Sequence, residues 1–331
     1  MNQCIELCSK ILRGSKWTKS FLYDPFKNFF RCSLCSYEYM LYYMSSNRPY
    51  RQHFSDEYKG REDGPVLGIL KDPFHGHQSY MKACMELGIG YRAIDIFASN
   101  WIEQVKNSGC NMFLVWPEES IQEVKRLYDD RLRFIVEQMG KRIFPELLAT
   151  WLYGSKERQC FWMELNDVYR PWTKIFYRKD EALDFVSNLA AYPLIAKTDI
   201  GAVSSGVAIL RSKRMSERYI QKAFGKGIQG YYSDRQARQW RHVLLQEYLL
   251  DVKEWRVHRI GDSFFGFGKV KRGDFHSGSG ETDWILPPVE AFNLAWEITE
   301  RGGFKSMAVD IFETLDGRFL VNELQCVYGQ H

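Results

Sequence analysis

The sequence lacks the features that mark several classes of protein. It contains no run of about 18 apolar residues, so we expect no membrane-spanning helix. Its first residues, MNQCIELCSKILRGSKW, include no sustained apolar segment of the kind found in secretory signals, and we therefore expect a cytoplasmic protein. The net charge is only +4 and no basic stripe with interleaved aromatic residues occurs, so we expect no nucleic-acid partner.

Several common nucleotide-binding and catalytic motifs are also missing. There is no G-x-x-x-x-G-K-[ST] phosphate loop and no strand-coupled G-x-G-x-x-G, which excludes the usual P-loop and dinucleotide-binding arrangements. No nucleophile elbow or catalytic triad is present either. This absence fits a reaction that needs no covalent protein nucleophile.

Eight cysteines are scattered along the chain, and without a signal segment we expect reduced thiols rather than disulfides. Cys4, Cys8, Cys32 and Cys35 have spacings that suit a structural zinc ion. Their surroundings are aromatic and helical rather than knuckle-like, which favours the alternative of ordinary buried or free thiols.

The composition is typical of a soluble globular protein. The chain has 331 residues, 45% of them hydrophobic and 26% charged, which is enough for two or three core-bearing units. Residues 1–62 are aromatic and basic with near-helical apolar spacing, and we interpret them as a helical extension. The aromatic residues of 17–58 fit either a homodimer contact or core packing.

Residues 63–150 alternate strands with helices, which predicts an N-terminal parallel α/β lobe. The strands are expected at Val66–Leu70, Tyr91–Ile96, Asn111–Trp116 and Arg142–Phe144. Helices are expected at Tyr80–Leu87, ended by Gly88, and at Asn100–Asn107. His75 and His77 follow the first strand, where open α/β sheets bind ligands, so they are candidate substrate contacts. The alternative is a solvated pair in a loop.

From residue 151 the pattern becomes α+β, and we divide it into a unit of 151–250 and a unit of 251–331. Expected helices are Lys156–Leu165, Lys179–Ala190 and Pro288–Arg301. Expected strands are Leu194–Lys197, Val207–Leu210, Val243–Tyr248, Trp255–Ile260, Ser263–Lys271, Met307–Phe312 and Phe319–Gln325. The charged stretch 211–242 is typical of a solvated helix.

The last two strands flank Asp316-Gly317, a pair that favours a two-residue type I′ turn. In a hairpin with this turn, Asp310 lies opposite Glu323. Their Cβ atoms would then be about 4.5–5.5 Å apart, a spacing that is destabilising for like charges unless something else neutralises them.

Gln325 shares the sheet face of Glu323, because side chains alternate along a strand. Two carboxylates and an amide oxygen on one apolar face are the ligands that a hard divalent cation needs. The alternative is a solvated hairpin edge. Apolar residues beside these positions favour a buried sheet, and hence the metal: Val309, Ile311, Val321 and Leu324.

The stretch AKTDIGAVSSGVAIL places Lys197 at a strand end, before a Gly/Ser-rich loop and a returning strand. Backbone N–H groups of such a loop can close on phosphate oxygens, and a lysine adds a point charge. The stretch VLLQEYLLDVKEWRV follows, where a strand leaving its sheet can offer backbone groups to an adenine. An exposed edge strand with salt bridges is the alternative for this second stretch.

The order of these pieces, from about residue 66 to the end, resembles the ATP-grasp superfamily. The resemblance is to its ribosomal-S6-modification-like and glutathione-synthetase-like carboxylate–amine ligases. GSKE resembles the first nucleotide lysine motif, and IAKTDIGAVSSGV resembles the second lysine with its phosphate loop. LLQEYL resembles the adenine hinge, KEWRV the ribose-binding segment, and VDIFETLDGRFLVNELQ the Asp…Glu-x-Asn magnesium triad.

The resemblance implies roles for individual residues. Lys156 and Lys197 would contact the phosphates of ATP. The phosphate loop would contribute Gly201, Ser204, Ser205 and Gly206. The adenine hinge would consist of Gln246, Glu247, Tyr248 and Leu249. Glu254 would bind the ribose.

The metal and catalytic residues are implied in the same way. Asp310, Glu323 and Gln325 would hold magnesium, with two ions expected and manganese as an alternative. Gln325 stands where the family has asparagine, and its longer arm would shift or weaken one metal site. The segment GFGKVKRGDFHSGSG resembles the family segment whose arginine stabilises the transferring phosphoryl group. In this chain that residue is Arg272, with Lys271 or Lys269 beside it.

The resemblance implies an ATP-grasp fold of the α/β class with α+β character in its C-terminal half. It also implies a ligase that joins a carboxylate to an amine through an acyl phosphate, with release of ADP. The acid would be a small amino acid, a peptide or a sugar acid, and Arg256, His276, His75 and His77 would face it. Alternatives on the same fold are a phosphotransferase and a non-catalytic ATP-binding protein.

Overall fold

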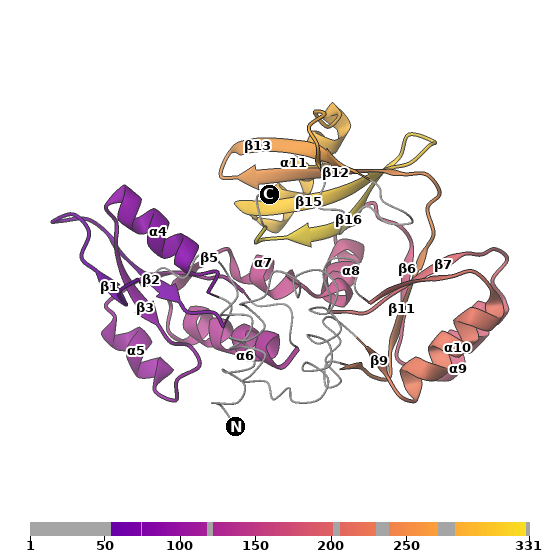
Figure 1. Ribbon diagram of the computed structural model, residues 1–331, viewed down its shortest axis with the longest axis horizontal. Coiled ribbons are helices and arrows are strands. Elements are labelled where there is room, and N and C mark those ends of the chain that lie inside the picture. The colour runs from indigo at the N-terminus through magenta and orange to yellow at the C-terminus, as the bar shows by residue number, and fades with distance from the viewer. Residues whose placement is uncertain are drawn as a thin grey trace, which may run out of the picture.

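The computed structural model describes residues 54–73, 75–117, 122–200, 206–229, 238–270 and 282–328. Their strands form three larger sheets, at the left, right and top of Figure 1, and one two-stranded sheet. The mixture of helices and sheets confirms the predicted α/β class. None of the helices in these ranges has the length and apolar character that a bilayer crossing requires.

The N-terminal sheet has the order β1-β3-β2-β4-β5. Its strands are β1 (Glu57–Tyr58), β2 (Val66–Leu70), β3 (Gly90–Ile94), β4 (Met112–Leu114) and β5 (Arg142–Phe144). The last four are parallel, as predicted. The helices of this lobe are α4 (Gln78–Leu87), α5 (Trp101–Asn107) and α6 (Gln122–Arg133), and α6 continues into the π-helical turn Phe134–Gln138.

Two details of this lobe concern its predicted boundaries. Helix α4 ends where expected, because Gly88 adopts a left-handed conformation with φ 69° and closes the helix C-terminus. The interpretation of residues up to 62 as a helical extension is wrong at its end. Strand β1 lies there and pairs antiparallel with β3 at the sheet edge. The part before residue 54, including the four cysteines considered for zinc, lies outside the described residues.

The second sheet has the order β6-β11-β7-β8 and its pairs are antiparallel. Its strands are β6 (Thr173–Phe176), β7 (Leu194–Lys197), β8 (Val207–Leu210) and β11 (Val243–Glu247). Helices α9 (Lys179–Ser187) and α10 (Lys213–Phe224) pack together over it, and the small β9 (Ile228–Gln229)–β10 (Arg238–Gln239) pair lies nearby. Because β11 lies between β6 and β7, the alternative of an exposed edge strand is wrong.

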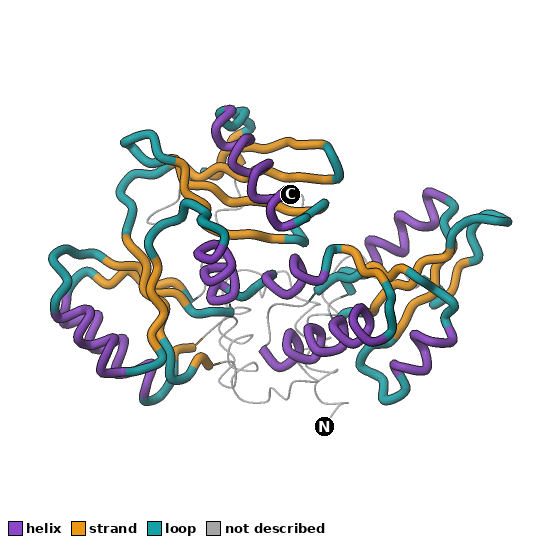
Figure 2. The backbone as a smooth tube through the Cα atoms, turned by 180° about the vertical axis from the view of Figure 1, so that it is seen from behind, coloured by secondary structure: helices purple, strands orange, loops and turns teal. Residues whose placement is uncertain are grey.

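The third sheet has the order β14-β13-β12-β15-β16 and is antiparallel throughout. Its strands are β12 (Lys253–Ile260), β13 (Ser263–Lys269), β14 (Thr282–Asp283), β15 (Ser306–Glu313) and β16 (Phe319–Gln325). Figure 2 shows the long helix α11 (Val289–Gly302) lying along this sheet, with α7 (Leu147–Leu152) and α8 (Lys156–Leu165) near the centre of the molecule.

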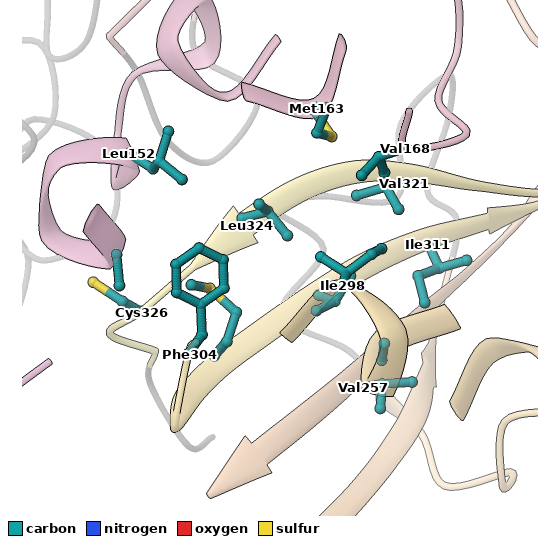
Figure 3. Packing of buried hydrophobic residues seen from close by; sticks show 14 of the residues in the cluster. Leu152, Met163, Val168, Val257, Ile298, Phe304, Ile311, Val321, Leu324 and Cys326 are labelled. Carbon is teal, nitrogen blue, oxygen red and sulfur yellow. The ribbon is translucent and has the colours of Figure 1, made fainter. Parts of the chain in front are cut away.

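A large hydrophobic core joins α7, α8 and α11 to one face of the third sheet (Figure 3). The four apolar residues predicted to flank the acids all belong to it: Val309, Ile311, Val321 and Leu324. Asp310, on the opposite face, is only 1% exposed. The alternative of a solvated hairpin edge is therefore wrong.

The turn of the last hairpin differs from the prediction. The backbone N–H of Thr314 donates to the carbonyl of Arg318, and that of Gly317 donates to the carbonyl of Thr314, both at 2.9 Å. The loop therefore contains three residues, with Gly317 left-handed at φ 81°. A type I turn followed by a left-handed glycine is the usual three-residue solution, and the predicted two-residue type I′ turn is wrong.

A β-bulge restores the predicted register further along the hairpin. With the longer loop, Ile311 pairs with Val321 rather than with Asn322. The register then shifts between Asp310 and Ile311, so that Asn322 is the extra residue. Asp310 consequently pairs with Glu323, as predicted.

Gln159 attaches α8 to the edge of the third sheet. Its side-chain oxygen accepts a hydrogen bond from the Leu324 N–H at 2.9 Å, and its amide donates to the Leu324 carbonyl at 2.9 Å. The amide also donates to the Leu152 carbonyl at 3.1 Å. Gln159 is 2% exposed, so these bonds replace water that cannot reach the groups.

We expect Gln159→Ala to lower the free energy of unfolding by about 3 kcal/mol, because buried backbone groups of Leu324 lose their partner. Denaturant unfolding of the intact protein measures this. The matched control is Leu165→Ala on the same helix, where the side chain is 83% exposed and the change should stay within about 0.5 kcal/mol. Equal effects of the two variants would contradict the attachment.

Candidate functional site

A pocket lies between the second and third sheets, with α8 as a further wall. It encloses about 400 Å³, including space open to solvent. Lys156 of α8, Lys197 of β7, Gln246 of β11 and Glu323 of β16 all line it. These residues come from four different predicted motifs, and the structure brings them together.

Asp199 connects the two lysine motifs. Its Oδ1 accepts hydrogen bonds from Ser155 Oγ at 2.9 Å and from the Glu157 backbone N–H at 2.8 Å. The Asp199 carbonyl accepts from Lys156 Nζ at 3.4 Å. Ser155 also caps α8 by accepting from the Arg158 N–H. The start of α8, and with it Lys156, is thus held against the segment that follows Lys197.

Lys197 connects the second sheet to the third. Its Nζ donates to Asn322 Oδ1 at 3.1 Å. Burial lowers the pKa of Lys197 to about 8, and the nearby charge of Lys156 contributes to the decrease, while Glu323 opposes it. An anionic ligand such as a phosphate would stabilise the protonated form of both lysines.

The bulge at Asn322 changes which residues reach this pocket. In a regular strand Asn322 would face the opposite side from Glu323, but the extra residue lets both line the pocket. Asn322 was not predicted as a site residue. Its signal in the sequence is the adjacent polar pair Asn322-Glu323, which interrupts the alternation of the strand.

The predicted adenine hinge begins at the pocket and then leaves it. Gln246 Nε2 donates to Thr173 Oγ1 at 2.9 Å, which joins β11 to β6. The Glu247 carboxylate accepts from the Trp172 backbone N–H at 2.7 Å. Tyr248 and Leu249 follow the end of β11 and lie outside the ladder.

A cluster of charges lies beside the pocket on the third sheet. The Arg256 guanidinium donates to both carboxylate oxygens of Asp310, at 2.7 and 2.8 Å. Lys269 Nζ donates to Asp310 Oδ2 and to Glu254 Oε1, each at 2.6 Å. The structure therefore places Arg256 and Glu254, predicted at the substrate and the ribose, around Asp310.

Burial and ion pairing act in opposite directions on the two acids of this cluster. Burial favours the neutral form of Asp310, but Arg256 and Lys269 outweigh it and hold the pKa of Asp310 well below its usual range. Burial raises the pKa of Glu254, and although Lys269 opposes this, the charge of Asp310 adds to it. Asp310 is thus the permanent anion of the cluster.

The predicted metal ligands fit a nucleotide-bound magnesium ion better than a resident metal. Asp310 and Glu323 are directly opposed, and Glu323 makes no side-chain hydrogen bond or ion pair within the described residues. A carboxylate has about four acceptor positions, so Asp310 keeps capacity beside Arg256 and Lys269. In the same part of the chain, no group of three His, Cys, Asp or Glu side chains could hold a metal alone. Magnesium commonly needs only one or two carboxylates, because phosphates and water complete its shell.

Two further predicted residues, Gly206 and Gln325, lie within the described part of the chain. Gly206 has φ +75°, and a Cβ there would lie 2.0 Å from Thr198 Oγ1, so the returning strand needs glycine at this point. Gln325 pairs with Ala308 on the face of Glu323. Six predicted residues lie outside the described residues: Gly201, Ser204, Ser205, Lys271, Arg272 and His276.

His75 and His77 line a second pocket, at the carboxyl ends of β2 and β3, of about 890 Å³ including open space. His77 is 4% exposed, and its Nδ1 lies 2.8 Å from Asp72 Oδ2. The alternative of a solvated pair is therefore wrong for His77. The structure does not bring the two histidines to the lysine pocket, whose lining it describes without them.

Sequence reasoning also missed residues whose roles depend on tertiary contacts. Arg170 and Thr173 line the lysine pocket, and Gln159 and Asp199 position its walls. Single polar residues of this kind carry no periodic signal.

Solved ATP-grasp structures share this fold. A RimK domain ATP-grasp protein from Sphaerobacter thermophilus is 16% identical with a TM-score of 0.55, covering 78% of this chain and 90% of that one. N5-carboxyaminoimidazole synthetase from Staphylococcus aureus, complexed with ADP, is 14% identical with a TM-score of 0.57 and coverages of 83% and 74%. D-alanyl-alanine synthetase A from Vibrio cholerae is 12% identical with a TM-score of 0.52 and coverages of 80% and 90%. No protein-family model and no curated protein matches the sequence. The chain has the ATP-grasp fold, which confirms the expectation from its motifs.

The lowered pKa of Lys197 predicts a pH dependence of nucleotide binding. A bound phosphate raises that pKa, so binding takes up a proton wherever the free lysine is neutral, and MgADP affinity should fall as pH rises through about 8. The decrease should approach about tenfold per pH unit, the limit for one proton. Calorimetry from about pH 7 to about pH 9.5 measures it.

Lys197→Arg is the matched variant, because a guanidinium stays protonated over this range. The affinity of this variant for MgADP should not fall with pH over this range, because no proton is taken up by the side chain at position 197. A wild-type affinity that is equally flat would show that Lys197 does not contact the phosphates.

Proposed function

We propose that this protein is an ATP-dependent ligase that joins a carboxylate to an amine and releases ADP and phosphate. The observation that carries the proposal is the convergence of Lys156, Lys197, Gln246 and Glu323 on one pocket between two sheets. The ADP-bound Staphylococcus aureus structure with the same fold supports a nucleotide as the ligand.

The nucleotide would lie with its adenine against Gln246–Leu249 and its phosphates against Lys156 and Lys197. Gly201, Ser204, Ser205 and Gly206 would cover the phosphates with backbone N–H groups. Glu254, whose carboxylate accepts a hydrogen bond from Lys269, would bind the ribose or position that lysine. Asn322 orients Lys197 through the hydrogen bond described above.

Asp310, Glu323 and Gln325 would hold magnesium, one or two ions, against the phosphates. The metal would supply neutralisation of the charge on the phosphate oxygens. Arg256 and Lys269 keep Asp310 ionised, so that this carboxylate is ready to bind a cation over the whole physiological pH range. The charge cluster around Asp310 would thus contribute to nucleotide binding, before the chemical step.

In the reaction, a substrate carboxylate oxygen attacks the γ-phosphorus of ATP and the bond to the β-phosphate oxygen breaks, giving an acyl phosphate and ADP. An amine then attacks the acyl carbon, loses a proton and displaces inorganic phosphate. Arg272, with Lys271 or Lys269, would stabilise the phosphoryl group during transfer. The substrates would be small molecules or peptides, and the pocket of His75 and His77 is a second candidate place for one of them.

Hydroxylamine trapping tests the proposed reaction. With ATP, magnesium and a panel of carboxylic acids, we expect acid-dependent ADP release and a hydroxamate, because hydroxylamine intercepts an acyl phosphate. ADP release with a phosphorylated alcohol and no hydroxamate would instead identify a phosphotransferase. Nucleotide binding without ADP release from any acid or alcohol would contradict catalysis.

We expect Glu323→Ala to reduce acid-dependent ADP release by about 100-fold or more, because charge stabilisation worth several kcal/mol is lost at the metal. The unfolding midpoint should stay close to that of the wild type, since no described residue bonds the Glu323 side chain. Glu290→Ala, an exposed acid on α11, is the control and should retain full activity. Undiminished ADP release by the Glu323 variant would remove this residue from the metal site.

A further inference from the structure

Register aligns the side chains of the third sheet in rows across the face that carries Asp310. One row consists of Phe267, Arg256, Asp310 and Glu323. The next, which we call the second row, consists of Phe265, His258, Ala308 and Gln325. The rows lie about 7 Å apart, because residues on the same face of a strand are two positions apart.

The nucleotide pocket approaches this face from one end. Among the described residues of β16, it is lined by Val321, Asn322 and Glu323. Gln325 is the next residue along the strand on the same face. The second row therefore lies beyond Asp310 and Glu323 as seen from this pocket.

His258, in the second row, is buried without a polar partner. It is 2% exposed, and within the described residues neither ring nitrogen has a hydrogen bond. Its ring stacks on Phe265 with centroids 4.8 Å apart, and Tyr328 meets it edge-on at 4.5 Å. Burying an imidazole in this way costs stability, and valine or phenylalanine would avoid the cost.

The residue next to His258 in the second row is the small Ala308. Ala308 separates His258 from Gln325, and the two outer residues are two strand spacings, or about 10 Å, apart. Tyr328 covers the His258 end, and among the described residues its hydroxyl lies 3.4 Å from Ser306 Oγ and 3.5 Å from the Arg259 carbonyl.

The N-terminal lobe lies close to Tyr328, the residue that covers His258. Tyr80 of α4 packs on Trp116 with ring centroids 5.8 Å apart, and Trp116 packs against the core of the third sheet. Burial raises the pKa of Tyr80, and the neighbouring Cys326 and Tyr328 add to the rise. The N-terminal lobe thus meets the third sheet on its core face and beside Tyr328, whose ring contacts His258.

We propose that His258 is a substrate-binding residue, whose imidazole hydrogen-bonds an uncharged polar group next to the reacting carboxylate of the acid. This inference rests on the proposed function, because it takes the acid to lie beside the last phosphate of ATP. The substrate class is a carboxylic acid with a nearby hydroxyl or amide group.

The surroundings of His258 exclude a second charge on that part of the acid. Burial lowers the pKa of His258 to about 4, with a contribution from Arg256, so the imidazole is neutral at physiological pH. Arg256 is already engaged by Asp310. An additional carboxylate or ammonium group would therefore lie among aromatic rings without an ion partner, which is unfavourable.

The proposed substrate class is tested with four acids as probes, in the presence of ATP, magnesium and hydroxylamine. Glycolate and N-acetylglycine carry the uncharged group, whereas succinate and glycine carry a second charge. We expect hydroxamate from the first two at a rate at least about tenfold above the last two, equivalent to about 1.4 kcal/mol. A preference for succinate or glycine would overturn the inference and leave the proposed function intact.

The residue is tested with His258→Phe, which keeps the ring and removes both nitrogens. We expect a higher unfolding midpoint, a KM for the acid raised at least about tenfold, and an unchanged KM for ATP, with partial rescue of the acid KM by His258→Asn. A purely structural imidazole would leave the acid KM unchanged, and that result overturns the inference. His242→Phe, outside the second row, is the matched control.

Failure of the proposed function is distinguishable from failure of this inference. Hydroxamate from none of the four acids counts against the ligase. The NMR signals of the His258 imidazole then decide the inference in the wild type. A change on addition of glycolate or N-acetylglycine, in the presence of MgADP, supports it, and no change with any of the four acids overturns it.

Discussion

Asp310 is a carboxylate at 1% exposure on a sheet whose other face is a hydrophobic core, so its charge must be neutralised within the protein. Arg256 and Lys269 do this from β12 and β13, and the bidentate geometry with Arg256 requires those residues to stand side by side. The same contacts set the position of the sheet face on which the proposed metal and substrate sites lie. A shift of one residue in register would move Asp310 into the apolar core.

The bulge at Asn322 extends this arrangement to the second sheet. Because of the bulge, Asp310 pairs with Glu323. The bulge also places Asn322 where its side-chain oxygen accepts a hydrogen bond from Lys197. Asp199 then links Lys197 to the start of α8, while Gln159 fixes α8 to β16. Specific hydrogen bonds between segments far apart in the chain, made by a few polar side chains, thus connect the walls of the pocket.

The parts of this fold that follow from local rules were predictable. Strands such as β2 and β7, helix α8 and the stop at Gly88 depend on periodicity and on glycine geometry. The pairing of Asp310 with Glu323 was also correct, but the predicted turn was wrong and the bulge compensated for it. Asn322 shows why: a bulge depends on tertiary contacts across strands, and alternation alone places that side chain in the core.

The candidate site was predictable to a similar extent. Lys156, Lys197, Gln246 and Glu323 came from motifs whose order is meaningful, and they do meet in one pocket. The partners that hold them could not be found in the same way, because Asp199 and Gln159 act through single long-range hydrogen bonds. The ion pairs of Glu254 and Arg256 were likewise invisible, since they arise only when β12 lies between β13 and β15.

In the proposed function, the pocket between the second and third sheets binds magnesium ATP in the orientation that the motifs imply. A crystal structure with magnesium and a non-hydrolysable ATP analogue tests it most directly. We expect adenine at Gln246–Leu249, phosphates at Lys156 and Lys197, and metal at Asp310 and Glu323. A nucleotide bound elsewhere, or in this pocket with its phosphates directed away from Asp310 and Glu323, would contradict it.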